Sequence, residues 1–361
     1  MTWARLSLCG LLIGGASLSV SAEALPRISV DADGSHFVAE DARFRVWGVN
    51  YDHDAAGTLL EDYWHTEWDR VEEDFREMKA LGVNVVRVHL QTHRFLDSPD
   101  QPNVDNLARL RALIDVAEDN GLYLNLTGLG QYHREDIPAW LLDLDEAARW
   151  NAQAGFWSAI ASVGRGRTAV FCYDLMNEPI LPGKNPETDW LAGEFGGKTF
   201  VQRLALEQRG RERGTIAEQW VQKMVASIRQ HDPEGLITVG VIPWGMTFPG
   251  AKPVFYAGPV AERLDFVSIH LYPKPTELDR VEAVLQSYSI NKPLVIEETF
   301  PLHCDPPTFR DFLRDLWPQT DGATGFYWGE GIEYYRARPD DIASGLVAAW
   351  LEILAAGPPA P

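Results

Sequence analysis

Residues 169–179 read AVFCYDLMNEP, an apolar run that ends at Asn177, Glu178 and a proline. Residues 293–299 read PLVIEET and repeat the arrangement with two acids, Glu297 and Glu298. Near-continuous apolar runs of this kind are typical of strands in a parallel sheet that is covered on both faces. Each run therefore predicts a buried strand that ends in a carboxylate at its carboxyl end.

Runs of this type alternate with segments of helical apolar spacing along most of the chain. Eight strand–helix units close most simply as a (β/α)8 barrel, the TIM-barrel form of the α/β class. An open doubly wound sheet is the alternative, but the Gly-rich first turn that it requires is missing. The predicted strands are 44–51, 83–90, 122–128, 169–176, 236–242, 266–272, 294–299 and 325–328. The predicted helices are 66–81, 104–120, 146–163, 216–231, 277–288, 308–317 and 341–355.

Two segments lie outside this alternation. Residues 28–38 contain Asp33-Gly34 between short apolar stretches and predict an N-terminal β-hairpin. Residues 183–215 form the longest connection and follow the fourth strand; they carry Trp190 and Phe195 among several glycines. Connections of this length are usually functional or disordered. We expect a partly helical lid over the site, with a solvated insertion as the alternative.

The first residues have the pattern of an export signal. Arg5 precedes an apolar stretch at residues 6–16, and Val20-Ser21-Ala22 offers a small-residue cleavage site. The apolar stretch is too short for a stable membrane span. A disordered or buried N-terminal segment is the alternative. The pattern predicts a signal peptide over 1–22 and a secreted or periplasmic mature chain, 23–361, that forms one domain and has no membrane segment.

Composition narrows the choice of partner. The 361 residues carry a formal net charge of −20, which argues against binding a nucleic-acid backbone. Cys172 and Cys304 are the mature chain's cysteines, and we expect both to be free thiols. No Cys/His spacing resembles a zinc site, and no Gly-rich phosphate loop is present. The sequence predicts neither a metal nor another cofactor, and it leaves the oligomeric state open.

Polar side chains gather where the predicted strands end. Active sites of (β/α)8 barrels lie at this carboxyl end, so these residues are expected to meet. Burying such groups costs free energy unless they are paired, which suggests a purpose beyond stability. The candidate site residues are Asn50, Arg87, His133, Asn177, Glu178, Trp244, His270, Tyr272, Glu298 and Trp328.

With these residues in place, the chain resembles the clan A glycoside hydrolases, and within them the cellulase-like and mannanase-like family 5. The resemblance spans residues 44 to about 328. It is carried by Gly48-Val49-Asn50, Arg87, Asn177-Glu178-Pro179, His270-Leu271-Tyr272-Pro273, Lys292-Pro293 through Glu298, and Trp328. The resemblance implies that Glu178 is the general acid/base and that Glu298 is the nucleophile. Strand alternation likewise places Glu298 on the face of Ile296 and places its rival, Glu297, on the other.

The resemblance also implies roles for the neighbouring side chains. Arg87 would keep the nucleophile ionised, and Asn177 would donate to the sugar 2-hydroxyl. Tyr272 would hydrogen-bond the nucleophile, and His270 would lie beside either carboxylate. Trp328 is expected under the reacting sugar. Asn50, Trp244 and His133 are further candidates for substrate binding, with His133 replacing a histidine that many family members carry after the third strand.

The function implied is that of a secreted retaining β-glycosidase that acts on a β-linked polysaccharide or oligosaccharide, with endo-β-mannanases or glucanases as the nearest types. An exo-acting β-glycosidase or a transglycosylase would use the same two glutamates. A carbohydrate-binding barrel without catalysis is the alternative from a different class. The sugar, the linkage and the mode of attack stay open, in part because the seventh strand ends in Glu298-Thr299-Phe300 rather than the commoner Glu-Phe-Gly.

Overall fold

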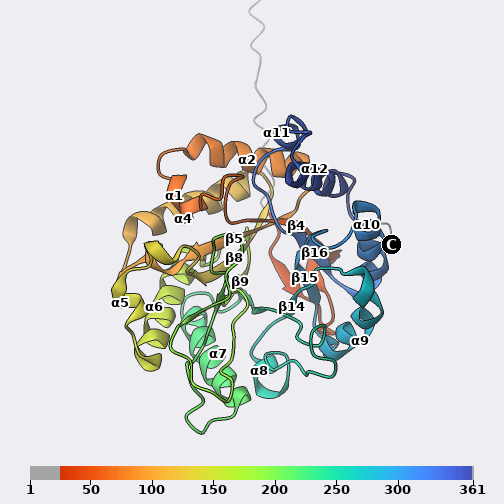
Figure 1. Cartoon of the computed structure of the whole chain (residues 1–361). Helices are drawn as coiled ribbons and strands as arrows, with labels where there is room; N and C mark the ends of the chain where they lie inside the picture. Colours follow the sequence, from red (N-terminus) through yellow and green to blue (C-terminus); the bar gives the residue numbers. More distant parts are fainter. Residues whose placement is uncertain (1–24, 360–361) are drawn as a thin grey trace, which may run out of the picture.

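The computed structural model describes residues 25–359, so the predicted signal peptide lies outside the described residues. One parallel sheet runs in the order β12-β9-β8-β5-β4-β16-β15-β14-β13. β12 (Leu236–Thr238) and β13 (Gly240–Val241) are two halves of the predicted fifth strand, and they pair with β9 and β14 respectively. The two edges of the sheet therefore belong to one strand, and the sheet closes into the predicted (β/α)8 barrel (Figure 1).

The other barrel strands are β4 (Val46–Tyr51), β5 (Val85–Gln91), β8 (Tyr123–Gly130), β9 (Val170–Asp174), β14 (Val267–His270), β15 (Leu294–Thr299) and β16 (Gly322–Gly325). The main outer helices are α2 (Trp68–Ala80), α4 (Val104–Asp119), α6 (Glu146–Gly164), α7 (Arg213–Arg229), α9 (Leu278–Tyr288), α10 (Pro306–Leu316) and α12 (Ile342–Ala355). Shorter helices are α1 (Leu60–Tyr63), α3 (Thr92–Phe95), α5 (Ala139–Leu142), α8 (Gly258–Glu262) and α11 (Ile332–Arg336). A small hairpin, β6 (Leu96–Ser98) with β7 (Gln101–Pro102), lies between β5 and α4.

The helices form where the sequence predicts them because their apolar residues recur at helical spacing. In α2, Val71, Phe75 and Met78 are fully buried and fall on one face of the helix. Asp145 accepts a hydrogen bond from the backbone N–H of Ala148 and caps α6. All seven predicted helices are present, with ends within three residues of the prediction.

The predicted N-terminal hairpin is present as β1 (Ile28–Val30) and β2 (Phe37–Ala39), and β3 (Ala42–Phe44) extends it to three antiparallel strands. Phe37 is fully buried and packs edge-on against Phe171 and Phe266, with both ring centroids 5.1 Å away. Phe171 and Phe266 lie at the starts of two barrel strands, so the hairpin covers the amino-terminal end of the barrel. The carboxyl-terminal end is left for the site.

The eighth strand differs from the prediction, which placed it at 325–328. β16 is Gly322–Gly325, three residues earlier. Its sequence, GATG, carries no apolar signal, because the space around it excludes side chains. A Cβ on Gly322 would lie 2.0 Å from the Val46 carbonyl oxygen, and a Cβ on Gly325 would lie 1.6 Å from the Trp350 ring. The aromatic run that suggested a strand therefore follows the strand's end.

Cys172 is buried in β9 and Cys304 lies partly buried in a loop, and both are free thiols as expected. Among residues 25–359, no helix combines the length and apolar character that crossing a bilayer requires.

Candidate active site

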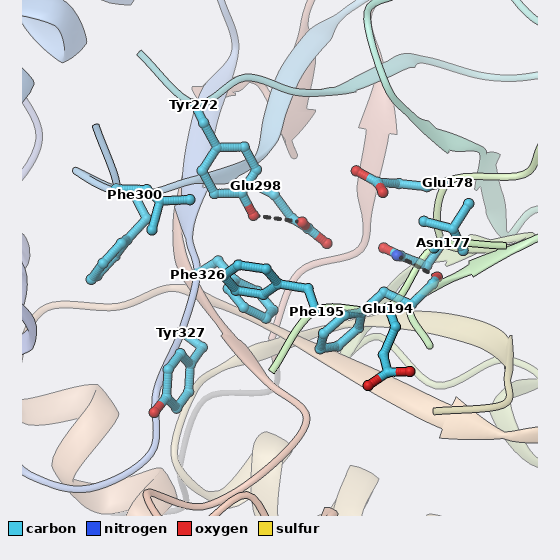
Figure 2. Close-up of a pocket in the computed structure, with 13 residues that line it drawn as sticks. Asn177, Glu178, Glu194, Phe195, Tyr272, Glu298, Phe300, Phe326 and Tyr327 are labelled. Carbon is cyan, nitrogen blue, oxygen red and sulfur yellow. Dashed lines mark hydrogen bonds between the residues drawn. The ribbon is translucent and has the colours of Figure 1, made fainter. Parts of the chain in front are cut away.

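Glu178 and Glu298 meet at the carboxyl end of the barrel, together with His270 from the end of β14. One carboxylate oxygen of each glutamate and one ring nitrogen of His270 all lie within 4.8 Å of one another. Nδ1 of His270 lies 2.8 Å from Oε1 of Glu178 and 3.4 Å from Oε2 of Glu298. Glu178 has a left-handed backbone (φ 46°), and its N–H donates to the carbonyl of Gly240 (2.9 Å). Figure 2 places both glutamates on the border of one pocket.

Both oxygens of Glu298 are held by hydrogen bonds. Nη1 of Arg87 donates to Oε1 (2.5 Å), and the hydroxyl of Tyr272 donates to Oε2 (2.8 Å; Figure 2). Arg87 is fully buried, and its Nη1 also donates to Oδ1 of Asn50 (2.8 Å). A charge-assisted bond to a buried guanidinium favours the ionised form of a carboxyl group. The geometry expected of Arg87 and Tyr272 is present.

Beneath the pocket lies a buried charge network, which we define as Arg87, Asp174, His270 and Glu297. Nη2 of Arg87 donates to Oδ2 of Asp174 (2.8 Å), and Nε of Arg87 lies 3.6 Å from Oε1 of Glu297. Nε2 of His270 lies 3.5 Å from Oε2 of Glu297. Asn125 and Ser268 donate further hydrogen bonds to the Glu297 carboxylate. The network places two cationic and two acidic groups in the interior of the barrel.

The charges of this network shift one another's pKa. Burial opposes ionisation of Glu297, but the Arg87 charge and the His270 ring outweigh it and lower the pKa of Glu297 to about 2. Burial also opposes protonation of His270, yet the carboxylates of Glu298, Glu178 and Glu297 raise its pKa to about 10. Burial and the charge of Glu297 raise the pKa of Asp174 to about 6, against the effect of Arg87. The surrounding carboxylates therefore favour the protonated form of His270, whose Nδ1 lies within hydrogen-bond distance of Glu178.

Glu297 and Glu298 are adjacent, but their surroundings differ. Glu297 is fully buried, whereas Glu298 borders the pocket. The expectation that strand alternation turns Glu297 to the other face is wrong, because both carboxylates reach Arg87 and His270. The pairing of β15 with β16 shifts register between Ile296 and Thr299, which breaks the alternation. Access to the pocket, rather than strand face, distinguishes the two acids.

The pocket combines polar and apolar surfaces. We define its carboxylate floor as Asn177, Glu178, Tyr272 and Glu298. We define its apolar wall as Phe195, Phe200, Val201, Phe300, Leu302, Phe326 and Tyr327. Gly193 and Glu194 complete the lining; Figure 2 shows Glu194 beside Phe195.

The structure brings most of the predicted site residues together. The four floor residues line the pocket, and Asn50, Arg87 and His270 lie buried beneath it. Nδ2 of Asn177 donates to the carbonyl of Phe200 (3.0 Å), and its Oδ1 accepts from Nη2 of Arg87 (3.0 Å). These bonds fix the amide at the border of the pocket.

Three predicted residues lie elsewhere. Trp328 is fully buried and does not line the pocket, because β16 ends three residues earlier than predicted. Phe326 and Tyr327 follow the end of the strand and line the pocket instead. Trp244 lies in a separate cavity beside Phe248, and His133 lies near Asp62 and Asp136.

Sequence reasoning missed Asp174 and the apolar wall. Asp174 stands inside the motif quoted first, four residues before Glu178, and its carboxylate bonds both Arg87 and the backbone N–H of Gly240 (2.8 Å). Phe300 and Leu302 could have been found as the residues two and four positions beyond Glu298. Phe200 carries no comparable signal in the sequence.

The predicted lid, 183–215, contains no helix before α7 begins at Arg213, so the expectation of a partly helical segment is wrong. It forms a short antiparallel pair, β10 (Leu191–Ala192) with β11 (Val201–Gln202). The backbone of Thr199 donates to Tyr132 (2.8 Å), and that of Leu204 donates to Ile180 (2.9 Å). Residues 199–204 of the segment are therefore hydrogen-bonded to the loops that follow β8 and β9.

The tip of the segment, residues 193–197, extends over the pocket. Gly193, Gly196 and Gly197 have positive φ angles of 75°, 58° and 78°, a conformation that glycine adopts without strain. Phe195 is 66% exposed and lines the pocket, whereas Trp190 is buried against Arg149, whose guanidinium carbon lies 4.7 Å from the ring centroid. Of the segment's two aromatic residues named above, Phe195 lines the pocket and Trp190 does not.

Comparisons with known proteins agree with the fold. The model of the cellulase family, glycosyl hydrolase family 5, matches residues 35–300, well over half of the chain. The fold is that of a barrel glycoside hydrolase, and the chain belongs to glycosyl hydrolase family 5. A search of curated proteins finds no match.

Solved structures share the fold at low identity. The exo-β-1,4-mannosidase Op5Man5 from Opitutaceae bacterium strain TAV5 is 18% identical with a TM-score of 0.63, and the match covers 91% of this chain and 62% of that one. The β-mannanase of the blue mussel Mytilus edulis is 16% identical with a TM-score of 0.61, covering 91% and 96%. An endogalactoceramidase is 20% identical with a TM-score of 0.57, covering 92% and 85%.

Proposed function

We propose that this protein is a retaining β-glycosidase in which Glu178 is the general acid/base and Glu298 is the nucleophile. The observation that carries the proposal is the approach of the two carboxylates, within 4.8 Å between oxygen atoms, at the border of one pocket. In retaining enzymes the two carboxyl groups lie about 5–5.5 Å apart, and in inverting enzymes about 6.5–9.5 Å apart. The short separation supports a covalent intermediate.

In the first step, a carboxylate oxygen of Glu298 bonds to the anomeric carbon while the bond from that carbon to the leaving oxygen breaks. The proton of Glu178 passes to the leaving oxygen. In the second step, Glu178 takes a proton from water as the water oxygen bonds to the anomeric carbon and the ester to Glu298 breaks. Atoms and charges balance over the two steps, and both carboxyl groups return to their starting states.

The neighbouring side chains support these roles. Arg87 and Tyr272 each bond one oxygen of Glu298, which orients the nucleophile and favours its ionised form. His270 bonds Oε1 of Glu178, which leaves Oε2 for the glycosidic oxygen. Asn177 lines the pocket between them and is our candidate for the sugar 2-hydroxyl. Mutation of Arg87 is expected to lower turnover, because Glu298 would lose the charged hydrogen bond that orients it.

We propose a β-linked polysaccharide or oligosaccharide as the substrate class, with β-mannan and β-glucan as the first choices. The names of the mannosidase and the mannanase with this fold support that order. Residues 198–204, which are hydrogen-bonded to the barrel, and the tip at 193–197 border one side of the pocket. This closed side favours exo-action or short substrates over internal attack on long chains. Product profiles on a long mannan separate exo from endo attack, and added acceptor sugars reveal transglycosylation.

Proton NMR during hydrolysis tests the mechanism directly. We expect the first product to carry the β configuration of the substrate. A first product of inverted configuration would rule out the covalent intermediate. A protein that binds the sugars but releases no product from any of them would support the non-catalytic binding barrel instead.

We further propose that residues 1–22 direct the protein out of the cytoplasm, on the strength of the sequence pattern. N-terminal sequencing of the protein from the exported fraction is expected to begin at Glu23. Retention of Met1 in the cytoplasmic fraction would contradict this proposal.

A further inference from the structure

The apolar wall is unusual for a pocket that is to receive sugar rings. Its side chains come from three separate segments: the insertion after β9, the loop after β15 and the residues after β16. Phe195 is 66% exposed and Leu302 is 43% exposed. Exposed apolar side chains scattered singly need no explanation, but a contiguous group that borders a catalytic pair marks a binding surface.

The polar groups of the pocket suffice for one sugar. A pyranose ring carries hydroxyls around its rim, and each hydroxyl that leaves water needs a hydrogen-bond partner. Glu178, Glu298, Asn177 and Tyr272 offer such partners on the carboxylate floor, and among the other lining residues Glu194 and the Tyr327 hydroxyl add polar side-chain groups. A second ring placed along the apolar wall would lose water from its hydroxyls with little compensation.

Stacking of sugar rings on aromatic faces does not account for the whole wall. Phe195, Phe300 and Phe326 have flat faces, but Leu302 and Val201 have neither a flat face nor a hydrogen-bonding group. Together they form the kind of surface that a flexible hydrocarbon chain covers completely. Because the apolar residues lie on three segments, an extended chain also reaches more of them than a single aromatic ring does.

We infer that, among β-glycosides, the pocket prefers one with an alkyl aglycone to one whose aglycone is a second sugar, with the reacting sugar on the carboxylate floor and the alkyl chain along the apolar wall. This inference rests on the proposed glycosidase function and names its substrate class. Each methylene that enters the pocket is expected to raise kcat/KM about threefold to fourfold, the value of transferring one methylene out of water.

The test compares methyl, butyl, hexyl and octyl β-glycosides as monomers, made with whichever sugar proves active as an aryl β-mannoside, glucoside or galactoside. Alkyl leaving groups of this series have nearly equal acidity, so their rates differ mainly through binding. We expect kcat/KM to rise with chain length and to exceed the value for the matching disaccharide. A flat series, or a disaccharide preferred over the octyl glycoside, overturns the inference and leaves the glycosidase proposal standing.

Two variants locate the effect. Phe195→Ser and Leu302→Ser remove apolar area from different segments, and each is expected to flatten the chain-length series. Phe248→Ser is the matched control, because Phe248 is 60% exposed but lies in the separate cavity with Trp244. An equal loss in the Phe248 variant contradicts the placement of the chain.

Calorimetry with alkyl 1-thio-β-glycosides, which resist hydrolysis, separates this inference from the proposed function. Affinity that rises with chain length, and falls in the Phe195 variant, supports the alkyl site even if no glycoside is hydrolysed. Affinity that is independent of chain length overturns it even if hydrolysis is fast. An aryl thioglycoside that binds more tightly than the octyl compound also overturns it, in favour of an aromatic aglycone.

Discussion

The buried charge network and the apolar wall both adjoin Glu178 and Glu298, the two carboxylates proposed to be catalytic, but they are built on different principles. Arg87 alone contacts Asp174, Glu297 and Glu298, so each charge in the network is held by several partners. In the apolar wall, Phe195 and Leu302 are largely exposed and lie on separate loops. The difference indicates that the network fixes the chemistry, whereas the wall can be altered residue by residue to change which substrate enters.

The largest expected effect is on catalysis. Glu178→Gln and Glu298→Gln should each lower kcat on unactivated substrates by at least about 10²–10⁴-fold, with the greater loss for the nucleophile. Both variants should remain folded, as circular dichroism would verify. An activated aryl leaving group should restore the first step of Glu178→Ala more than its second. Near-normal turnover by Glu298→Gln would contradict the assignment of Glu298 as the nucleophile.

The second prediction uses the adjacent acids to sharpen the comparison. Glu297→Gln leaves the Arg87 charge less compensated in the interior and is expected to cost about 3 kcal/mol of unfolding free energy. Glu298→Gln should cost less, because Glu298 opens to the pocket. Urea unfolding measures both. Equal losses of unfolding free energy in the two variants would contradict the view that the Glu297 charge is the more deeply buried of the two.

The third prediction concerns pH. The pKa of His270 is raised to about 10, mainly because the surrounding carboxylates outweigh burial, above the value of about 6.5 in an unfolded chain. Its protonation therefore stabilises the fold fully below about pH 6.5, and this contribution is lost as pH rises to about 10. The Tm advantage of the wild type over His270→Gln should shrink across this window. A constant difference would mean that His270 is not protonated in the fold.

The smallest expected effect is that of the wall. Phe195→Ser should raise KM by about threefold to tenfold and leave Tm nearly unchanged, because Phe195 is exposed and its loss uncovers no core. Thermal unfolding and steady-state kinetics on the best substrate test this. Replacing the entire 183–215 segment should instead lower Tm, since residues 198–204 are hydrogen-bonded to the barrel. A marked loss of Tm in Phe195→Ser would make the tip a structural element.

The barrel could be read from the sequence because buried parallel strands and amphipathic helices leave strong periodic signals. Seven strands lie within two residues of their predicted ends. The eighth strand, Gly322–Gly325, lacks this periodic signal. Its first and last positions require glycine because neighbouring atoms leave no room for larger side chains. Because the strand was placed too late in the sequence, Trp328 was expected at the pocket, where the structure has Phe326 and Tyr327.

The paired glutamates were predictable because strand ends of a closed barrel converge. The network beneath them was harder to predict, because Asp174 lies inside an apolar strand and the register shift that brings Glu298 to the same side as Glu297 has no local sequence signal. The wall depends on loop conformations between elements, which periodicity does not determine. Sequence patterns thus specified the residues on strands better than those on loops.

The contact between Gly325 and Trp350 has a practical consequence for anyone who trims or tags this protein. Trp350 lies on α12, the last helix, and its ring occupies the space beside the residue that directly precedes Phe326. Helix α12 therefore packs against the strand end that leads into the apolar wall of the pocket. A fusion partner joined after Gly357 should be harmless, whereas a truncation that removes α12 should lower Tm and displace Phe326 together, because the helix buries Trp350, Leu351 and Leu354 in the core.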